Sequence, residues 1–100
     1  LKTPTMTRPT RLPDAEVTTL AQRLPEWAVS TDGLSISRRW VFQDFVQAFA
    51  FMTEMAQVSE RLNHHPDWRQ VYNRLDVTLT THDAGGLTPL DVAWAEEAER

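Results

Sequence analysis

The sequence predicts an α+β domain in which a four-stranded antiparallel sheet has three helices packed on one face. Two observations lead to this fold class. Apolar residues recur at helical spacing in three separate stretches of the chain, and two pairs of strand-like runs lie between them. The resulting order is helix, hairpin, long helix, hairpin, helix. That order favours a sheet with its helices gathered on one side.

Composition limits what the chain can be. One hundred residues are enough for a single domain with one core. The net charge of -4 comes from scattered charges, so we expect no direct nucleic-acid binding. Without cysteine there is no disulfide, thiolate nucleophile or cysteine-ligated zinc. No apolar run approaches the roughly 20 residues that span a bilayer, and no signal peptide is recognisable. We therefore expect no membrane partner and a cytoplasmic location.

Residues 1–12 are expected to form a flexible tail that buries almost nothing, because they are mostly prolines, threonines and basic side chains. Residues 13–100 then form the single domain. Its first helix is predicted to begin at Pro13, a residue that the first turn tolerates, and to end before Pro25. Four apolar residues follow the spacing of an amphipathic helix: Val17, Leu20, Ala21 and Leu24.

A first hairpin is predicted over residues 27–30 and 34–42. Residues 31–33, Thr-Asp-Gly, are a turn signal between these two strand-like runs. The second run places apolar side chains at alternate positions, as a half-buried strand does, and departs from the pattern only at Arg38.

A long helix is predicted next. Asp44 and Gln47 resemble a capping box, and no proline or glycine interrupts the chain until Pro66. One apolar stripe of this helix consists of Phe45, Phe49, Met52 and Ala56. A second stripe, about 100° away at helical spacing, consists of Phe51, Met55, Val58 and Leu62. Both together are wider than one sheet contact needs, so either the helix is deeply buried or the second stripe packs against another subunit.

The second hairpin is predicted over residues 68–73 and 75–81, around a turn at 73–74, with alternating apolar residues in its second strand. Residues 82–86 then form a loop. The final helix is predicted to run to about Glu99. Its start has a cap, a first-turn proline and a capping-box carboxylate, which are Thr88, Pro89 and Asp91.

All three histidines lie in one stretch of the second half of the chain, and unperturbed imidazole has a pKa of roughly 6.5. Glu60 and His64 are four residues apart at the end of the long helix, so this carboxylate can orient this imidazole. Pro66 disfavours helical geometry at His65, so the two adjacent histidines leave the chain in different directions. With His82 at a strand end, they can surround one small ligand with proton donors and acceptors.

Each of these residues also has a plainer interpretation. Two histidines before a proline are often a solvated helix end, His82 alone would be a loop residue, and Asp91 alone would be a capping residue. A zinc site would need ligands at a standard spacing, which these histidines do not have, so no metal site is predicted.

The residues of this stretch form the pattern Glu60-x3-His64-His65-Pro66-x5-Tyr72-x9-His82-x8-Asp91, set within LNHHPDW and VYNRLDVTLTTHDAGGLT. This pattern resembles the pterin-4a-carbinolamine dehydratase family, and the resemblance extends from the first helix to the end of the chain. It implies an α+β subunit with a four-stranded antiparallel sheet, assembling as a homodimer or homotetramer.

The resemblance also implies a reaction. Such enzymes dehydrate the 4a-hydroxytetrahydropterin released by aromatic amino acid hydroxylases, and the quinonoid dihydropterin that they form is reduced back to the active cofactor. They act on this pterin substrate with neither a metal nor a bound organic cofactor.

Carried over residue by residue, His64 and His82 would be the acid/base pair near the C4a hydroxyl and N5, and His65 would place the pterin. Glu60 would orient or tune His64, and Asp91 would steady His82 or the polar edge of the ring. Three more residues are expected near the substrate, although the aromatic ones could equally pack in the sheet: Pro66, Trp68 and Tyr72.

A rival interpretation is a non-catalytic scaffold. Members or relatives of this family also act as a dimerisation cofactor of a homeodomain transcription factor and as assembly factors for RuBisCO, through protein contacts. The sequence names no such partner. Because every motif residue is present, we expect an enzyme.

Overall fold

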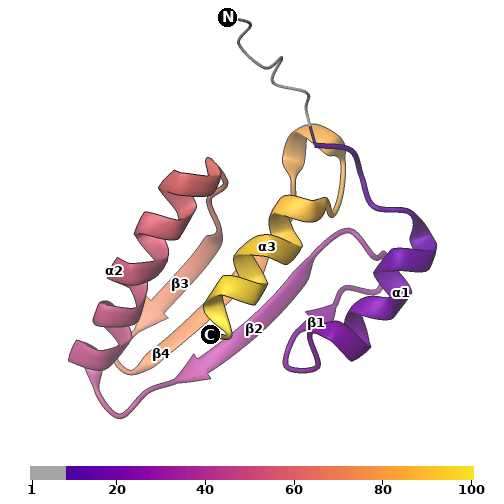
Figure 1. Ribbon diagram of the computed structural model, residues 1–100. Helices are drawn as coiled ribbons and strands as arrows, with labels where there is room; N and C mark the ends of the chain where they lie inside the picture. Colours follow the sequence, from indigo (N-terminus) through magenta and orange to yellow (C-terminus); the bar gives the residue numbers. More distant parts are fainter. Residues whose placement is uncertain (1–8) are drawn as a thin grey trace, which may run out of the picture.

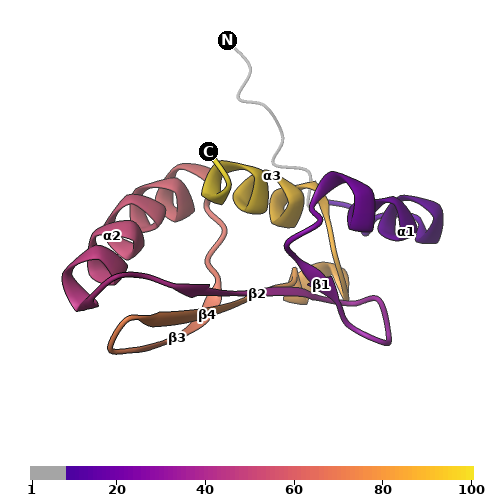
Figure 2. The same ribbon diagram turned by 90° about the horizontal axis from the view of Figure 1, so that it is seen from below.

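The computed structural model describes residues 9–100 and shows the expected α+β architecture (Figure 1). The elements are α1 (Asp14–Arg23), β1 (Ala28–Val29), β2 (Ile36–Val41), α2 (Phe45–Leu62), β3 (Asp67–Val71), β4 (Arg74–Leu79), a 3-10 turn (His82–Ala84) and α3 (Pro89–Ala98). The four strands pair antiparallel in the order β1-β2-β4-β3. Figure 2 shows all three helices on one face of the sheet. Within residues 9–100, no helix is long and apolar enough to cross a membrane.

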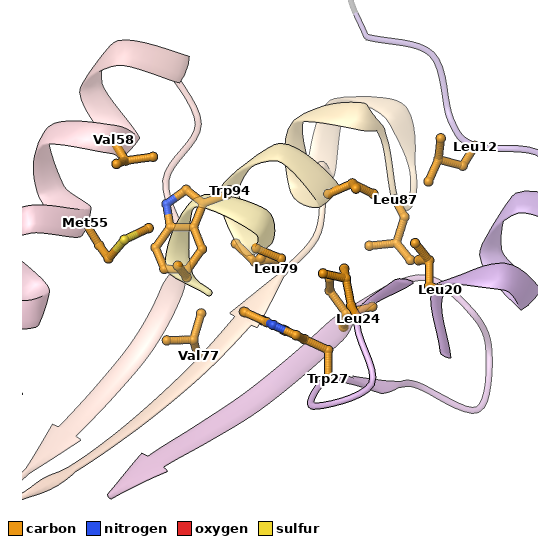
Figure 3. Close-up of a cluster of buried hydrophobic side chains, with 14 of the residues drawn as sticks. Leu12, Leu20, Leu24, Trp27, Met55, Val58, Val77, Leu79, Leu87 and Trp94 are labelled. Atoms are coloured by element: carbon orange, nitrogen blue, oxygen red, sulfur yellow. The ribbon is translucent and has the colours of Figure 1, made fainter. Parts of the chain in front are cut away.

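The core lies between the sheet and the three helices. Strand β4 points its apolar residues Leu75, Val77 and Leu79 inward, and all three are buried. Trp94 of α3 is fully buried at the centre of this layer, next to α2 (Figure 3). Burying a large apolar side chain contributes about 1.5 to 3 kcal/mol, so these inward faces account for the layered arrangement.

One polar contact joins α2 to α3 inside this core. The indole Nε1–H of Trp94 donates to Oγ of Ser59 at 2.9 Å, and that hydroxyl donates to the Met55 carbonyl at 2.7 Å. Both Trp94 and Ser59 are buried. The serine therefore supplies the acceptor that a buried indole N–H needs.

Replacing Ser59 with alanine should lower the free energy of unfolding by about 1 to 3 kcal/mol, because the Trp94 N–H would stay buried without an acceptor. Urea denaturation of the variant and the wild type measures the difference. Ser37→Ala, at an exposed position of β2, is the matched control and should change the stability by less than about 0.5 kcal/mol. Equal stability of all three proteins would contradict the assigned contact.

The directions of the two apolar stripes of α2 do not agree with the expectation that the second stripe contacts another subunit. The second stripe belongs to the subunit's own core: Met55 and Val58 are buried, and the partly buried Phe51 and Leu62 pack against that core. The idea that this stripe meets another subunit was wrong, because α2 turns it toward β4 and α3. Large apolar side chains are exposed instead at the start of the helix: Phe45 (45%), Val46 (72%) and Phe49 (53%).

The apparent break at Arg38 is explained by its neighbours. Arg38 shares the inward side of β2 with Ile36 and Trp40, and its guanidinium lies 4.5 Å from the centre of the Trp40 ring. The same guanidinium pairs with Glu99, which also accepts a hydrogen bond from Nε1 of Trp27 at 3.0 Å. The long stem thus covers apolar surface while its charge meets a carboxylate.

The open face of the sheet is polar. Arg39 donates to Asp76 at 2.6 Å, and this hydrogen bond, with the charges of Arg39, Arg74 and Arg69, holds the pKa of the Asp76 carboxyl below its usual value. A depressed carboxyl pKa stabilises the fold above the unfolded-state pKa, and this contribution is lost as the pH falls through the folded-state pKa. The pair is exposed, so its effect is small.

Several local details differ from the predicted ones. Leu12, placed in the predicted tail that buries almost nothing, is buried in the core and donates its N–H to the Leu87 carbonyl at 2.7 Å. Residues 1–8 lie outside the described part. The second hairpin turns at Tyr72, which has a φ of 51°, and Asn73, not at residues 73–74. At the start of α2, Asp44 caps Gln47 as expected, but the Gln47 side chain accepts from the Gln43 N–H.

Candidate functional site

A cavity of about 570 Å³ opens where the ends of α2 and β4 meet the start of α3. His64, His65 and His82 all line it. Its wall also includes Pro9, Asn63, Asp83 and other residues of these three segments. The volume lies within the range of about 300 to 1,000 Å³ that is usual for small-molecule sites. The three histidines predicted from the sequence are therefore brought to one site.

The end of α2 separates the two adjacent histidines. The helix ends at Leu62 because Asn63 takes the left-handed conformation, with a φ of 49°. The His64 N–H then donates to the Ser59 carbonyl at 3.0 Å, and the Asn63 N–H to the Glu60 carbonyl at 3.2 Å. This closure is a Schellman-type cap. The helix ends three residues before the residue that Pro66 restricts, and His64 turns inward while His65 remains exposed.

His64 is held by Asp91 from below the cavity. Its Nε2 lies 2.5 Å from Oδ1 of Asp91, across 27 residues of sequence. His64 is 9% exposed and Asp91 is 0% exposed. The other carboxylate oxygen, Oδ2, accepts hydrogen bonds from the Thr88 N–H at 2.9 Å and the Thr81 hydroxyl at 2.8 Å. Asp91 therefore completes the predicted capping box of α3 with one oxygen and binds His64 with the other.

This contact defines the proton positions on His64. A carboxylate oxygen accepts, so Nε2 bears the hydrogen that it donates to Asp91. Nδ1 is then the basic nitrogen of the neutral ring. In the described part of the chain, the Nε of Arg74 is the only buried side-chain nitrogen or oxygen without a partner, and no protein group bonds Nδ1 of His64. His64 itself lines the cavity.

Glu60 pairs with the other histidine. Its Oε2 lies 2.6 Å from Nε2 of His65, and both side chains are exposed. The prediction that Glu60 orients His64 was therefore wrong: the rule that residues four apart are neighbours holds only within a helix, and His64 lies beyond the end of α2. Asp91 contacts His64 in its place, and its other oxygen bonds Thr81 and Thr88.

His82 lines the same cavity and is the first residue of the 3-10 turn that follows β4. His82 is exposed. The 3-10 turn ends at Gly85, which has a φ of 72°. Thr81, directly before it, is fixed by backbone hydrogen bonds with Gly86 in both directions. The His82 ring is thus carried on a short, anchored turn, from which it can exchange protons with a ligand and with solvent.

Comparison with known proteins identifies the family. A family model described as pterin 4 alpha carbinolamine dehydratase matches residues 10–100. The chain belongs to this dehydratase family. A protein of Mesorhizobium japonicum with the provisional name pterin-4-alpha-carbinolamine dehydratase is 52% identical over 92 residues, covering 92% of this chain and 93% of the relative. A protein of Novosphingobium aromaticivorans with the same provisional name is 52% identical over 89 residues, covering 89% and 93%.

Solved structures agree on the fold of the dehydratase family. A transcriptional coactivator/pterin dehydratase from Brucella melitensis superposes with a TM-score of 0.85 at 39% identity, covering 90% of this chain and 96% of the other. A pterin dehydratase-like protein, identified as a RuBisCO assembly factor in the alpha-carboxysome, has a TM-score of 0.63 at 21% identity and covers 74% and 86%. The second likeness shows the shared fold alone.

Two residues expected near the pterin of a dehydratase lie elsewhere. Trp68 packs against Trp94 in the core, with ring centres 6.2 Å apart. Tyr72 is exposed in the turn after β3, while His65 precedes that strand, and the five residues of β3 span about 16 Å. Neither residue is part of the cavity wall. Pro66 also lies outside the wall, between His65 and β3.

The groups around the cavity are suited to proton transfer. His64 offers a basic nitrogen backed by a buried carboxylate, and His82 offers a solvent-exposed imidazole. Within residues 9–100, no three histidine, aspartate or glutamate side chains are grouped so that they could hold a metal ion. Sequence reasoning missed the part of Thr81, whose contact with Asp91 leaves no local pattern.

Proposed function

We propose that this family member is a cytoplasmic hydro-lyase that removes water from 4a-hydroxytetrahydropterin and forms the quinonoid dihydropterin. Reduction of that product would regenerate the cofactor of aromatic amino acid hydroxylases. The observation that best supports the proposal is the pairing of a buried carboxylate, Asp91, with His64, which lines the same cavity as His65 and His82.

The reaction requires one proton to be removed and one to be supplied. Neutral His64 takes the N5 proton through Nδ1, and the electron pair of that N–H bond forms the N5–C4a double bond. The C4a–O bond breaks, and protonated His82 donates a proton so that the oxygen leaves as water. Asp91 stabilises the His64 imidazolium that forms, as a buried carboxylate does behind a catalytic histidine. Proton exchange with solvent then restores both histidines.

His65 has a different part in this proposal. Its Nε2 is paired with Glu60, and the residue is exposed and lines the cavity. There it would contact the pterin and help to fix the ring between His64 and His82. Acid/base assistance of this kind contributes about 10² to 10⁴-fold in rate, which is enough for a dehydration that proceeds slowly without an enzyme.

Stopped-flow measurement of the dehydration of freshly made 4a-hydroxytetrahydropterin tests this function. We expect the protein to accelerate the reaction over buffer, with the same rate in millimolar chelator because no step uses a metal. An uncatalysed rate would refute the dehydratase and favour a non-catalytic scaffold that acts through protein contacts. Chelator-sensitive activity restored by zinc would refute the metal-free mechanism.

We also propose that the protein forms a homo-oligomer, a dimer or a tetramer, through the exposed start of α2. Phe45 and Phe49 lie side by side, with ring centres 5.7 Å apart, and Val46 is more exposed than either. Residues 45–52, FVQAFAFM, contain no charged side chain. A second copy can therefore place the same surface against this one without repulsion, as a two-fold interface requires.

Replacing Phe49 with glutamate should shift the protein to monomers, because two charges would face each other across that two-fold axis. Sedimentation velocity at tens of micromolar measures the species. Gln57→Glu changes an exposed residue of the same helix away from Phe45 and Phe49, and it should leave the assembly unchanged. A wild-type protein that sediments as a monomer would overturn the proposed assembly, and an intact Phe49→Glu oligomer would place its interface elsewhere.

A further inference from the structure

Two threonine hydroxyls lie behind the Asp91–His64 pair, in a part of the site that the proposed reaction does not use. The Oγ1 of Thr81 lies 2.8 Å from Oδ2 of Asp91 and 2.7 Å from Oγ1 of Thr88. Thr88 is fully buried and Thr81 nearly so. The three side chains come from the end of β4 and the start of α3. They form a closed polar cluster beneath His64.

When Asp91 is ionised, the hydrogen bonds of this cluster can have only one donor-to-acceptor order, from Thr88 to Thr81 to Asp91. The Leu90 N–H donates to Oγ1 of Thr88 at 3.3 Å, which leaves the Thr88 hydroxyl hydrogen free for another acceptor. A hydroxyl has one hydrogen. If Thr81 gives its hydrogen to Asp91, the hydrogen between the two threonines must come from Thr88. Every hydrogen bond then points toward the carboxylate.

The hydrogen bonds to Oδ2 fix the position of the Asp91 carboxylate. Its Oδ2 receives one donor from a backbone that α3 fixes and one from Thr81, whose backbone is bonded to Gly86. The Thr88 N–H and the Thr81 hydroxyl together fix the orientation of the carboxylate. Its other oxygen, Oδ1, then faces Nε2 of His64. The orientation of the His64 ring is thus set from the end of β4 as well as from α3.

We propose that Thr81 is a positioning residue, whose hydroxyl keeps Asp91 aligned so that His64 keeps its hydrogen on Nε2 and presents Nδ1 to the substrate. The part that concerns the rate rests on the proposed dehydratase function. The part that concerns the histidine tautomer does not. Residues that orient a metal-binding histidine through its hydrogen-bond partner typically contribute about 10- to 100-fold in activity, and we expect an effect of the same order here.

The test compares Thr81→Val, which keeps the shape and removes the hydroxyl, with Thr81→Ser, which restores it. We expect kcat for dehydration to fall about 10- to 100-fold in the valine variant and to recover most of that loss in the serine variant. Thr78→Val, on the open face of β4, makes the same chemical change away from the cavity and should leave kcat unchanged. A valine variant with the wild-type kcat would overturn the proposal.

Nitrogen-15 spectra of the imidazole rings give a second readout that needs no substrate. In the wild type, His64 should show a protonated Nε2 and an unprotonated Nδ1. In Thr81→Val, the population of this form should fall, and in Thr81→Ser it should return. A purely structural threonine would lower the melting temperature and leave the tautomer of His64 unchanged, which would overturn the proposal.

The two readouts separate failure of this inference from failure of the proposed function. If the wild type does not accelerate dehydration, the dehydratase assignment fails, and the spectra alone decide whether Thr81 sets the tautomer. If Thr81→Val does not fold, the wild-type spectrum decides: a His64 ring with its hydrogen mainly on Nδ1 would overturn the proposed arrangement, and one with its hydrogen on Nε2 would support it.

Discussion

Replacing His64 with alanine is expected to lower kcat about 10² to 10⁴-fold, because the variant loses the base that takes the substrate proton. His82→Ala should have an effect of similar size, since it removes the acid that protonates the leaving oxygen. Both variants should remain folded, because neither imidazole fills the apolar core. Stopped-flow rates together with circular dichroism and thermal melts measure the two effects separately.

The double variant and His65 supply the controls for this first result. Losing both His64 and His82 should cost more than either alone if they assist different bonds. His65→Ala removes a histidine of the same cavity that transfers no proton in the proposed reaction, so it should raise KM more than it lowers kcat. A double variant with the wild-type rate would remove histidine chemistry from the mechanism.

Asp91→Asn is expected to have the second large effect, by inverting the tautomer of His64. The Thr88 N–H donates to Oδ2 and cannot turn around, so the amide oxygen of asparagine must occupy that position. The amide nitrogen then faces Nε2 of His64 as a donor, and the ring must carry its hydrogen on Nδ1. The analogous change behind a catalytic histidine in a serine protease lowers kcat on the order of 10⁴-fold.

Glu60→Gln is the matched control, since it makes the same change at the other carboxylate paired with a histidine. Glu60 and His65 are both exposed, so we expect kcat to change by less than about threefold, in line with the small energies of exposed ion pairs. Kinetics and nitrogen-15 spectra of both variants decide between them. The opposite order, with Glu60→Gln the more damaging, would restore the pairing inferred from sequence spacing.

The fold could be predicted because its signals are local. The alternation of Leu75, Val77 and Leu79 and the cap formed by Thr88, Pro89 and Asp91 each lie within a few residues of sequence. The orientation of α2 could not be predicted in the same way. Both of its stripes are apolar, and which one faces inward depends on where α3 places Trp94, a contact between distant parts of the chain.

The histidines of the candidate site could be predicted from the sequence, but their carboxylate partners could not. The three histidines were identified from their place in the chain, and all three line the cavity. His64 pairs with Asp91 instead of Glu60, because Asn63 ends α2 in a left-handed conformation and directs His64 away from the helix. A backbone reversal of this kind replaces a neighbour four residues away with one 27 residues away, and no spacing rule anticipates it.

The two uses of the Asp91 carboxylate affect how evolution can act on this fold. One oxygen caps α3 and the other holds His64. A descendant that abandoned catalysis would lose any need for the histidines, yet it would still need an acceptor for the Thr88 N–H at the start of the last helix. An aspartate at this position in a related sequence would therefore indicate that α3 is capped, and would not by itself indicate the proposed dehydration chemistry.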